Sequence, residues 1–142
     1  MWPQTPEERL HSWYQLRLDA SEMPLESCLA AVNDWWFLAP MNSRYLHWDD
    51  VDNWPTPWEL LNDNIFCDVA RALGMLYTIA IIERPEITEL SMFQTDEDNL
   101  VQINQGKYIL NWGNQQVVNI NSVTSTEIKK HISSENFQHV IR

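Results

Sequence analysis

Cys67 is the residue of this sequence whose type and position could support nucleophilic chemistry. It follows Phe66, and the apolar positions from Val69 to Leu76 recur at the spacing of one buried helical face. With Asp63 or Asn64 as the predicted cap, Cys67 lies in the first turn of this helix. The backbone N–H groups and the dipole of a helix N-terminus favour a thiolate there and could form half of an oxyanion hole.

A nucleophilic cysteine needs a base, and no histidine lies between residues 87 and 120. The histidines of the chain are His11, His47, His131 and His139. If the protein is a hydrolase, His47 or His139 would have to act as the base for Cys67. We favour the interpretation that Cys67 is a small buried apolar residue, because a cysteine without a base usually is. Neither Cys67 nor Cys28 belongs to a metal-type pair, and we read both as reduced thiols.

The segment Phe66–Ala70, which reads Phe-Cys-Asp-Val-Ala, resembles the cysteine helix of transglutaminase-like proteins, and Gly74 follows it. The resemblance implies a hydrolase layout, shared with papain-like enzymes, in which antiparallel strands follow the helix that carries the nucleophile. Those families place a histidine on the first or second strand after the helix. This sequence departs from the pattern at that point, which puts the implied activity in doubt.

Residues 40–55 form a second candidate site, because they combine acidic side chains with a histidine and tryptophans. The segment lacks a sustained period and is predicted to be a long irregular connection, and such connections are often functional. Its acidic residues are candidate ligands for a hard cation, although their spacing is not that of a calcium loop; they are Asp49, Asp50 and Asp52. We favour a solvated acidic loop pinned by its tryptophans. No cofactor is predicted, because the sequence has no glycine-rich phosphate loop.

Two helix starts share one local signal. Thr5–Glu8 and Thr56–Glu59 each place a capping threonine before a proline and a glutamate at the third helical position. The second helix is predicted from Pro24 to before Pro40, and the third over Pro57–Leu61. A fourth helix follows, but after Met75 the β-branched composition of Tyr77–Ile82 slightly favours a strand, with a helix that continues to about Ile82 as the alternative.

Residues 87–120 predict an antiparallel meander of short strands separated by polar turns. The strands are expected at 87–93, 100–103, 108–112 and 116–120. Residues 121–142 are a C-terminal tail, in which Ser125–Ile128 could start a short helix and Phe137–Ile141 could be a last strand or a docking tail. The predicted fold class is α+β, in a single domain of residues 1–142. Its helical half, residues 1–82, packs on one face of the meander.

The chain carries a formal charge of −11 at pH 7, and its acidic residues are unevenly distributed. Residues 1–100 contain 18 Asp and Glu but only five Arg, whereas residues 101–142 carry a charge of +2. This balance argues against nucleic acid as a partner and fits a basic docking surface on a partner protein. No signal peptide is recognised, and the longest apolar run is too short to span a membrane. We therefore expect a cytoplasmic protein with no membrane partner.

The run from Trp54 to Gly74 and the Asn- and Gln-rich meander resemble small proteins of tailed bacteriophages. This resemblance spans about residues 35–82 and implies a virion or assembly component with no catalytic residues to assign. We expect a non-enzymatic structural or assembly protein that acts through contacts with other protein subunits, which could include copies of itself. The alternatives are the cysteine hydrolase and an acidic inhibitor that mimics a charged ligand.

Aromatic side chains are the predicted contact residues, because tryptophan and tyrosine dominate many protein interfaces. They are Trp35, Trp36, Tyr45, Trp48 and Trp54. For Trp35 and Trp36 the other interpretation, which we favour, is that their rings cover the core at the end of the second helix.

Overall fold

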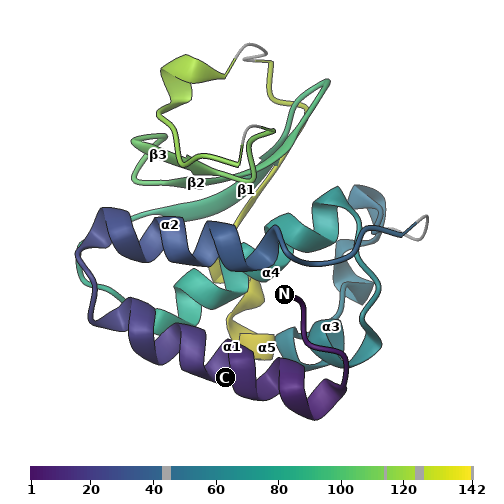
Figure 1. Ribbon diagram of the computed structural model, residues 1–142. Helices are drawn as coiled ribbons and strands as arrows, with labels where there is room; N and C mark the ends of the chain where they lie inside the picture. The colour runs from purple at the N-terminus through teal and green to yellow at the C-terminus, as the bar shows by residue number, and fades with distance from the viewer. Residues whose placement is uncertain (43–45, 114, 124–126, 142) are drawn as a thin grey trace.

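The computed structural model describes residues 1–42, 46–113, 115–123 and 127–141. Helices make up the N-terminal half, and a four-stranded antiparallel sheet lies in the C-terminal half, which confirms the α+β class. Figure 1 shows the sheet on one side of the central helix and the first and third helices on the other. Tyr45 lies outside the described residues.

Three of the helices before the sheet begin where local signals predict, whereas the 3₁₀ helix lies in the segment 40–55 that was predicted to be irregular and the last helix begins later than predicted. They are α1 (Pro6–Ser21), α2 (Leu25–Trp36), the 3₁₀ helix η1 (Trp48–Asn53), α3 (Pro57–Asp63) and α4 (Asp68–Ile82). Both predicted capping boxes are present. Thr5 accepts a hydrogen bond from the Glu8 N–H at 3.1 Å, and Thr56 accepts one from the Glu59 N–H at 3.2 Å.

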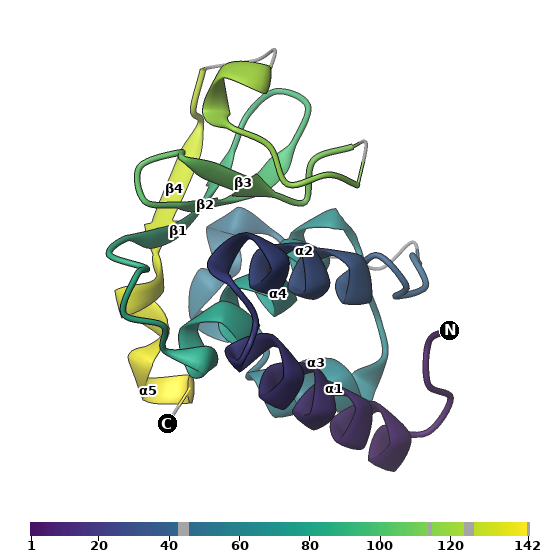
Figure 2. The same cartoon turned by 60° about the vertical axis from the view of Figure 1, so that its left-hand side comes forward.

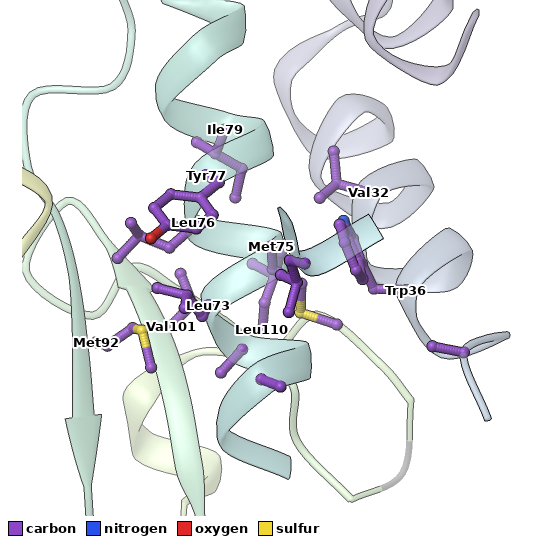
Figure 3. Packing of buried hydrophobic residues seen from close by; sticks show 14 of the residues in the cluster. Val32, Trp36, Leu73, Met75, Leu76, Tyr77, Ile79, Met92, Val101 and Leu110 are labelled. Atoms are coloured by element: carbon purple, nitrogen blue, oxygen red, sulfur yellow. The ribbon is translucent and has the colours of Figure 1, made fainter. Parts of the chain in front are cut away.

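Helix α4 continues to Ile82, so the strand that composition favoured after Met75 is wrong. The helix is surrounded: α1, α2 and α3 pack on it, and β1 and β2 cover another side. Figure 3 shows Val32 and Trp36 beside α4, and Met92 and Val101 of the sheet nearby. Burial on nearly all sides explains a helix that is apolar all round, because packing overrides the weak β preference of branched residues.

The sheet has the strand order β3-β2-β1-β4. Its strands are β1 (Leu90–Gln94), β2 (Asn99–Ile103), β3 (Tyr108–Leu110) and β4 (Lys130–Ser133). The first three form the predicted meander. The predicted fourth strand, 116–120, is wrong: this segment makes one bridge, between Val118 and Ile109, and the fourth strand is β4, which pairs with β1.

The chain that follows β3 turns away because Asn111 and Gln115 adopt positive φ angles of 64° and 58°. It then passes over the face of the sheet opposite the helices, as Figure 2 shows. Val123 from this segment packs there with Phe93, Leu100 and Ile109. The elements in this half that belong to no sheet are η2 (Ile120–Ser122), η3 (Ser134–Phe137) and α5 (Gln138–Ile141). The predicted last strand at Phe137–Ile141 is therefore helical.

None of the helices in the described ranges has the length and apolar content needed to cross a membrane.

Candidate functional site

A cavity of about 490 Å³ lies where the N-terminus of α4 meets the sheet and the segment that leads into η1. Cys67 and Asp68 line it from the helix, Gln94 and Asn99 from the sheet, and Leu46 and His47 from the segment before η1. Trp48, Asp49, Val69 and Lys130 complete the lining. We call it the Cys67 cavity. It brings the predicted nucleophile and one of its two predicted bases to one place.

Cys67 is the N-cap of α4, not a residue of its first turn as predicted. The predicted caps end the preceding helix instead: Asp63 is the last residue of α3, and Asn64 follows it in the left-handed conformation with φ of 56°. The chain is extended again at Cys67, where φ is −133°. The side chain of Cys67 therefore stands at the helix entrance.

The sulfur of Cys67 accepts hydrogen bonds from two backbone N–H groups. The Ala70 N–H donates at 3.4 Å, and the Leu46 N–H donates at 3.3 Å from the neighbouring segment. Backbone donors at a helix N-terminus stabilise negative charge, either on a sulfur or on the oxyanion of an acyl intermediate. Cys67 is half-buried, so a small reagent can reach it.

The sheet side of the cavity carries amides where the cysteine hydrolase families carry a histidine. Gln94 and Asn99 lie at the ends of β1 and β2 that face α4. The Asn99 side chain donates to Asp68 Oδ2 at 2.9 Å and accepts from Gln94 at 3.2 Å and from the Trp48 indole N–H at 2.9 Å. An amide can orient a substrate, but it cannot take a proton from a thiol.

A polar network behind this wall fixes α4 to the sheet. Asn111 is buried, and its side chain donates to Asp68 Oδ1 at 3.1 Å and to the Asn99 carbonyl at 2.8 Å. Arg71 donates to Asn111 Oδ1 at 2.7 Å and pairs with Asp68 at 3.2 Å. Burial lowers the pKa of Arg71, and the Asp68 carboxylate opposes that shift. The Asp68 carboxylate is the centre of this network, although its side chain is still 43% exposed.

His139, the other predicted base, lines a separate cavity of about 300 Å³. It lies there with Asp52, Trp54, Tyr77 and Phe137. The structure thus leaves His47 as the candidate base for Cys67.

The acidic residues of η1 point to different neighbours. Asp49 pairs with Lys130 at 3.3 Å, and Asp50 accepts from the Asn53 side chain at 2.6 Å. Asp52 is exposed beside the cavity that contains His139. Within the ranges that the structure describes, no three His, Cys, Asp or Glu side chains converge as metal ligands would. The predicted ligands Asp49, Asp50 and Asp52 thus do not form a cation site in this arrangement.

The tryptophans predicted as contact residues take two kinds of position. Trp36 and Trp54 are 1% and 7% exposed, so the prediction that they contact a partner is wrong and the core interpretation holds for Trp36. Trp35 and Trp48 are half-buried, and their indole N–H groups are bonded to Ser12 at 3.0 Å and to Asn99. These two hydrogen bonds connect Trp35 to α1 and Trp48 to β2, so both side chains help to stabilise the fold.

Sequence reasoning missed the exposed apolar residues of the first and third helices. On α1, Leu10, Tyr14 and Leu18 are 40%, 51% and 45% exposed, and Trp58 on α3 is 51% exposed. We call these four residues the α1–α3 surface. Their spacing of four along α1 is visible in the sequence, and it adds a second apolar face to the buried one that contains Trp13.

A scan against protein-family models and a search of curated proteins each find no match to this chain.

Proposed function

We propose that the protein acts through protein–protein contacts and that the α1–α3 surface is where a partner binds. The observation that supports this proposal is the exposure of four large apolar side chains on two helices that pack against each other. Trp58 packs edge-on against Trp13 with ring centroids 5.5 Å apart, which joins α3 to α1. Figures 1 and 2 both show α1 and α3 on the side of the molecule away from the sheet. A grouped set of exposed apolar residues is typical of an interaction site.

Arg17 gives this surface a polar centre. Its guanidinium carbon lies 4.1 Å from the Trp13 ring centre and 5.6 Å from that of Tyr14. Its Nε–H is buried without a hydrogen-bond acceptor. Tryptophan, tyrosine and arginine are the residues that most often carry the binding energy of an interface. A partner that supplied an acceptor to Arg17 would satisfy this donor on binding.

The chemistry of the partner follows from the charges around this surface. Glu7, Asp19 and Glu59 are exposed on the same two helices, and the whole chain carries a charge of −11. A partner with apolar side chains surrounded by lysine or arginine would match this pattern. The resemblance of residues 35–82 to small proteins of tailed bacteriophages suggests another virion or assembly subunit as that partner.

Truncation of the α1–α3 surface should abolish partner binding and leave the fold intact. We expect the double variant Tyr14→Ala, Trp58→Ala to recover at least about tenfold less partner than the native chain, because both are hot-spot residue types. The measurement is quantitative mass spectrometry of the subunits that copurify with the tagged full chain from its native source. Thermal unfolding of each variant checks the fold.

The matched control for this experiment is Leu38→Ala, Ile65→Ala, because both residues are 45% exposed and lie outside the α1–α3 surface. It should leave partner recovery unchanged. Equal losses in the two double variants, or no loss in either, would contradict the proposed surface.

The cysteine hydrolase is a second candidate function, favoured by the common cavity of Cys67 and His47. In this reading Cys67 attacks an acyl carbon, His47 takes the thiol proton, and the backbone N–H groups of Leu46 and Ala70 support the negative charge that develops. The amides of Gln94 and Asn99 would orient the substrate.

Alkylation of the thiols tests this second candidate. Iodoacetamide at neutral pH should modify Cys67 well before Cys28, because burial raises the pKa of Cys28 and also blocks the reagent. If His47 is the base, His47→Ala should slow the modification of Cys67, whereas His139→Ala should not, since it lines another cavity. Peptide mapping gives both rates. Equal rates in the two histidine variants would remove His47 as the base and, with it, the hydrolase.

A further inference from the structure

A cavity of about 440 Å³ lies on the side of α2 that faces the start of β3 and residues 115–117. Glu26, Ala30, Asn33 and Asp34 line it from the helix, and Tyr108 and Val117 line it from the sheet side. We call it the α2 groove. It shares no residue with the α1–α3 surface or with the Cys67 cavity. Its volume is in the range of common ligand sites.

The unusual residue of this groove is Asn33. It is fully buried, and its Oδ1 accepts the Asn111 N–H at 3.0 Å, which determines the orientation of the amide. The other half of the amide, Nδ2, has no hydrogen-bond partner. A buried donor without an acceptor is costly, and such groups in native proteins call for an explanation. A ligand oxygen seated in the groove would provide the acceptor.

Two carboxylates flank this amide along the helix. Glu26 and Asp34 are exposed, and among the described residues neither forms an ion pair. They are eight residues apart, which corresponds to about 12 Å along an α-helix. Ala30 lies between them, and its small side chain leaves the middle of the groove open. An elongated ligand with a positive charge towards each end would fit this arrangement.

We propose that the α2 groove binds an extended basic peptide segment of a partner protein, with a backbone carbonyl accepting from Asn33 Nδ2. Two basic side chains of the segment pair with Glu26 and Asp34. In an extended chain, residues four positions apart are about 13 Å apart, which matches the spacing of the two carboxylates. The proposal does not depend on the α1–α3 surface, because the groove is a separate site.

The experiment titrates the full chain with the peptide acetyl-Lys-Ala-Ala-Ala-Lys-amide and follows the side-chain amide signals of Asn33 by ¹H–¹⁵N NMR. We expect saturable shifts of these signals. The peptide acetyl-Glu-Ala-Ala-Ala-Glu-amide should not shift them. The compound 1,8-diaminooctane, which has two ammonium groups but no carbonyl, should leave the Asn33 signals in place.

Variants of the groove provide the second part of the test. Ala30→Leu should block the groove and abolish binding, while Glu26→Gln, Asp34→Asn should weaken it about tenfold through the loss of two ion pairs. The matched control, Asp50→Asn, Asp52→Asn, removes two exposed charges of η1 and should leave affinity unchanged. Asn33→Asp keeps the oxygen that accepts the Asn111 N–H and removes the Nδ2 donor. If this variant does not fold, the affinity of Ala30→Leu still decides whether the peptide binds in the groove.

The proposal is overturned by any of three results: no shift of the Asn33 signals at millimolar peptide, equal affinity in Ala30→Leu, or an equal loss in the η1 control. The last result would mean diffuse charge attraction to an acidic protein. Because the readout is at Asn33, failure here leaves the α1–α3 surface untouched, and failure of that surface leaves this site untouched.

Discussion

Replacement of Thr78 by valine should destabilise the protein far more than replacement by serine. The Thr78 hydroxyl accepts the indole N–H groups of Trp13 and Trp36, each at 2.9 Å, and donates to the Gly74 carbonyl at 2.7 Å. All three hydrogen-bonding positions of the hydroxyl are therefore used, in a site that is fully buried. Valine has nearly the same shape and leaves both indole donors without an acceptor.

The expected difference is large. Each buried donor without an acceptor costs roughly 1–3 kcal/mol, so Thr78→Val should lower the free energy of unfolding by roughly 2–6 kcal/mol. Thr78→Ser keeps the hydroxyl and loses one methyl group, which should cost about 1 kcal/mol. Urea unfolding followed by tryptophan fluorescence measures both values. A valine variant as stable as the serine variant would show that these two bonds contribute little.

Gly74→Ala should also destabilise the fold, although alanine is the better helix former. A Cβ atom at Gly74 would lie 2.5 to 2.7 Å from three ring atoms of Trp36. The ring is enclosed by the core and has little room to move, since Trp36 is 1% exposed. Overpacking of this kind costs roughly 1–3 kcal/mol and opposes a helix-propensity gain of at most about 1 kcal/mol. The net change should be a loss of stability.

Two further variants isolate the cause. Gly113→Ala is the matched control, because no atom lies within 4 Å of a Cβ added there, and it should leave the free energy of unfolding nearly unchanged. Trp36→Leu removes the colliding ring, so Gly74→Ala should cost less in that background than in the native one. Equal costs in both backgrounds would mean that the Trp36 ring is not the obstacle.

The Cys67 cavity illustrates why a site is harder to predict than the elements around it. The sequence correctly places a cysteine near the start of a helix that antiparallel strands follow. It cannot show that Asn64 takes a left-handed conformation and moves the cap to Cys67, because Asp63, Asn64 and Cys67 can all act as caps. Nor does the sequence show that His47, and not His139, lies in the same cavity as Cys67. That depends on where the tertiary fold places the segment before η1 and the C-terminal helix relative to the start of α4.

The tryptophans show the same limit. A large aromatic residue contributes equally well to a core or to an interface, so its type alone does not decide between them. Trp36 is buried because Gly74 provides a place for its ring and Thr78 an acceptor for its N–H, and both residues are about forty positions away. Trp58 is exposed because α3 turns Pro57, Leu60 and Leu61 into the core, whereas the Trp58 ring packs edge-on against Trp13 at 5.5 Å and stays 51% exposed.

What the sequence by itself determined is what depends on neighbouring residues. The capping boxes at Thr5 and Thr56 need partners three positions away, and the hairpins of the meander need alternating strands joined by short turns. These signals are local, so they establish the starts of α1 and α3, the first three strands and the α+β class without reference to the rest of the chain.

What only the tertiary structure decided is what depends on residues distant in the chain. The run Met75–Ile82 is helical because it is enclosed between helices and sheet, and Lys130–Ser133 becomes the fourth strand because the edge of β1 is open to it. The exposure of Leu10 and Tyr14, the fully bonded hydroxyl of Thr78 and the unpaired Nδ2 of Asn33 have the same origin. Burial and hydrogen bonding are properties of the assembled fold, and no short segment specifies them.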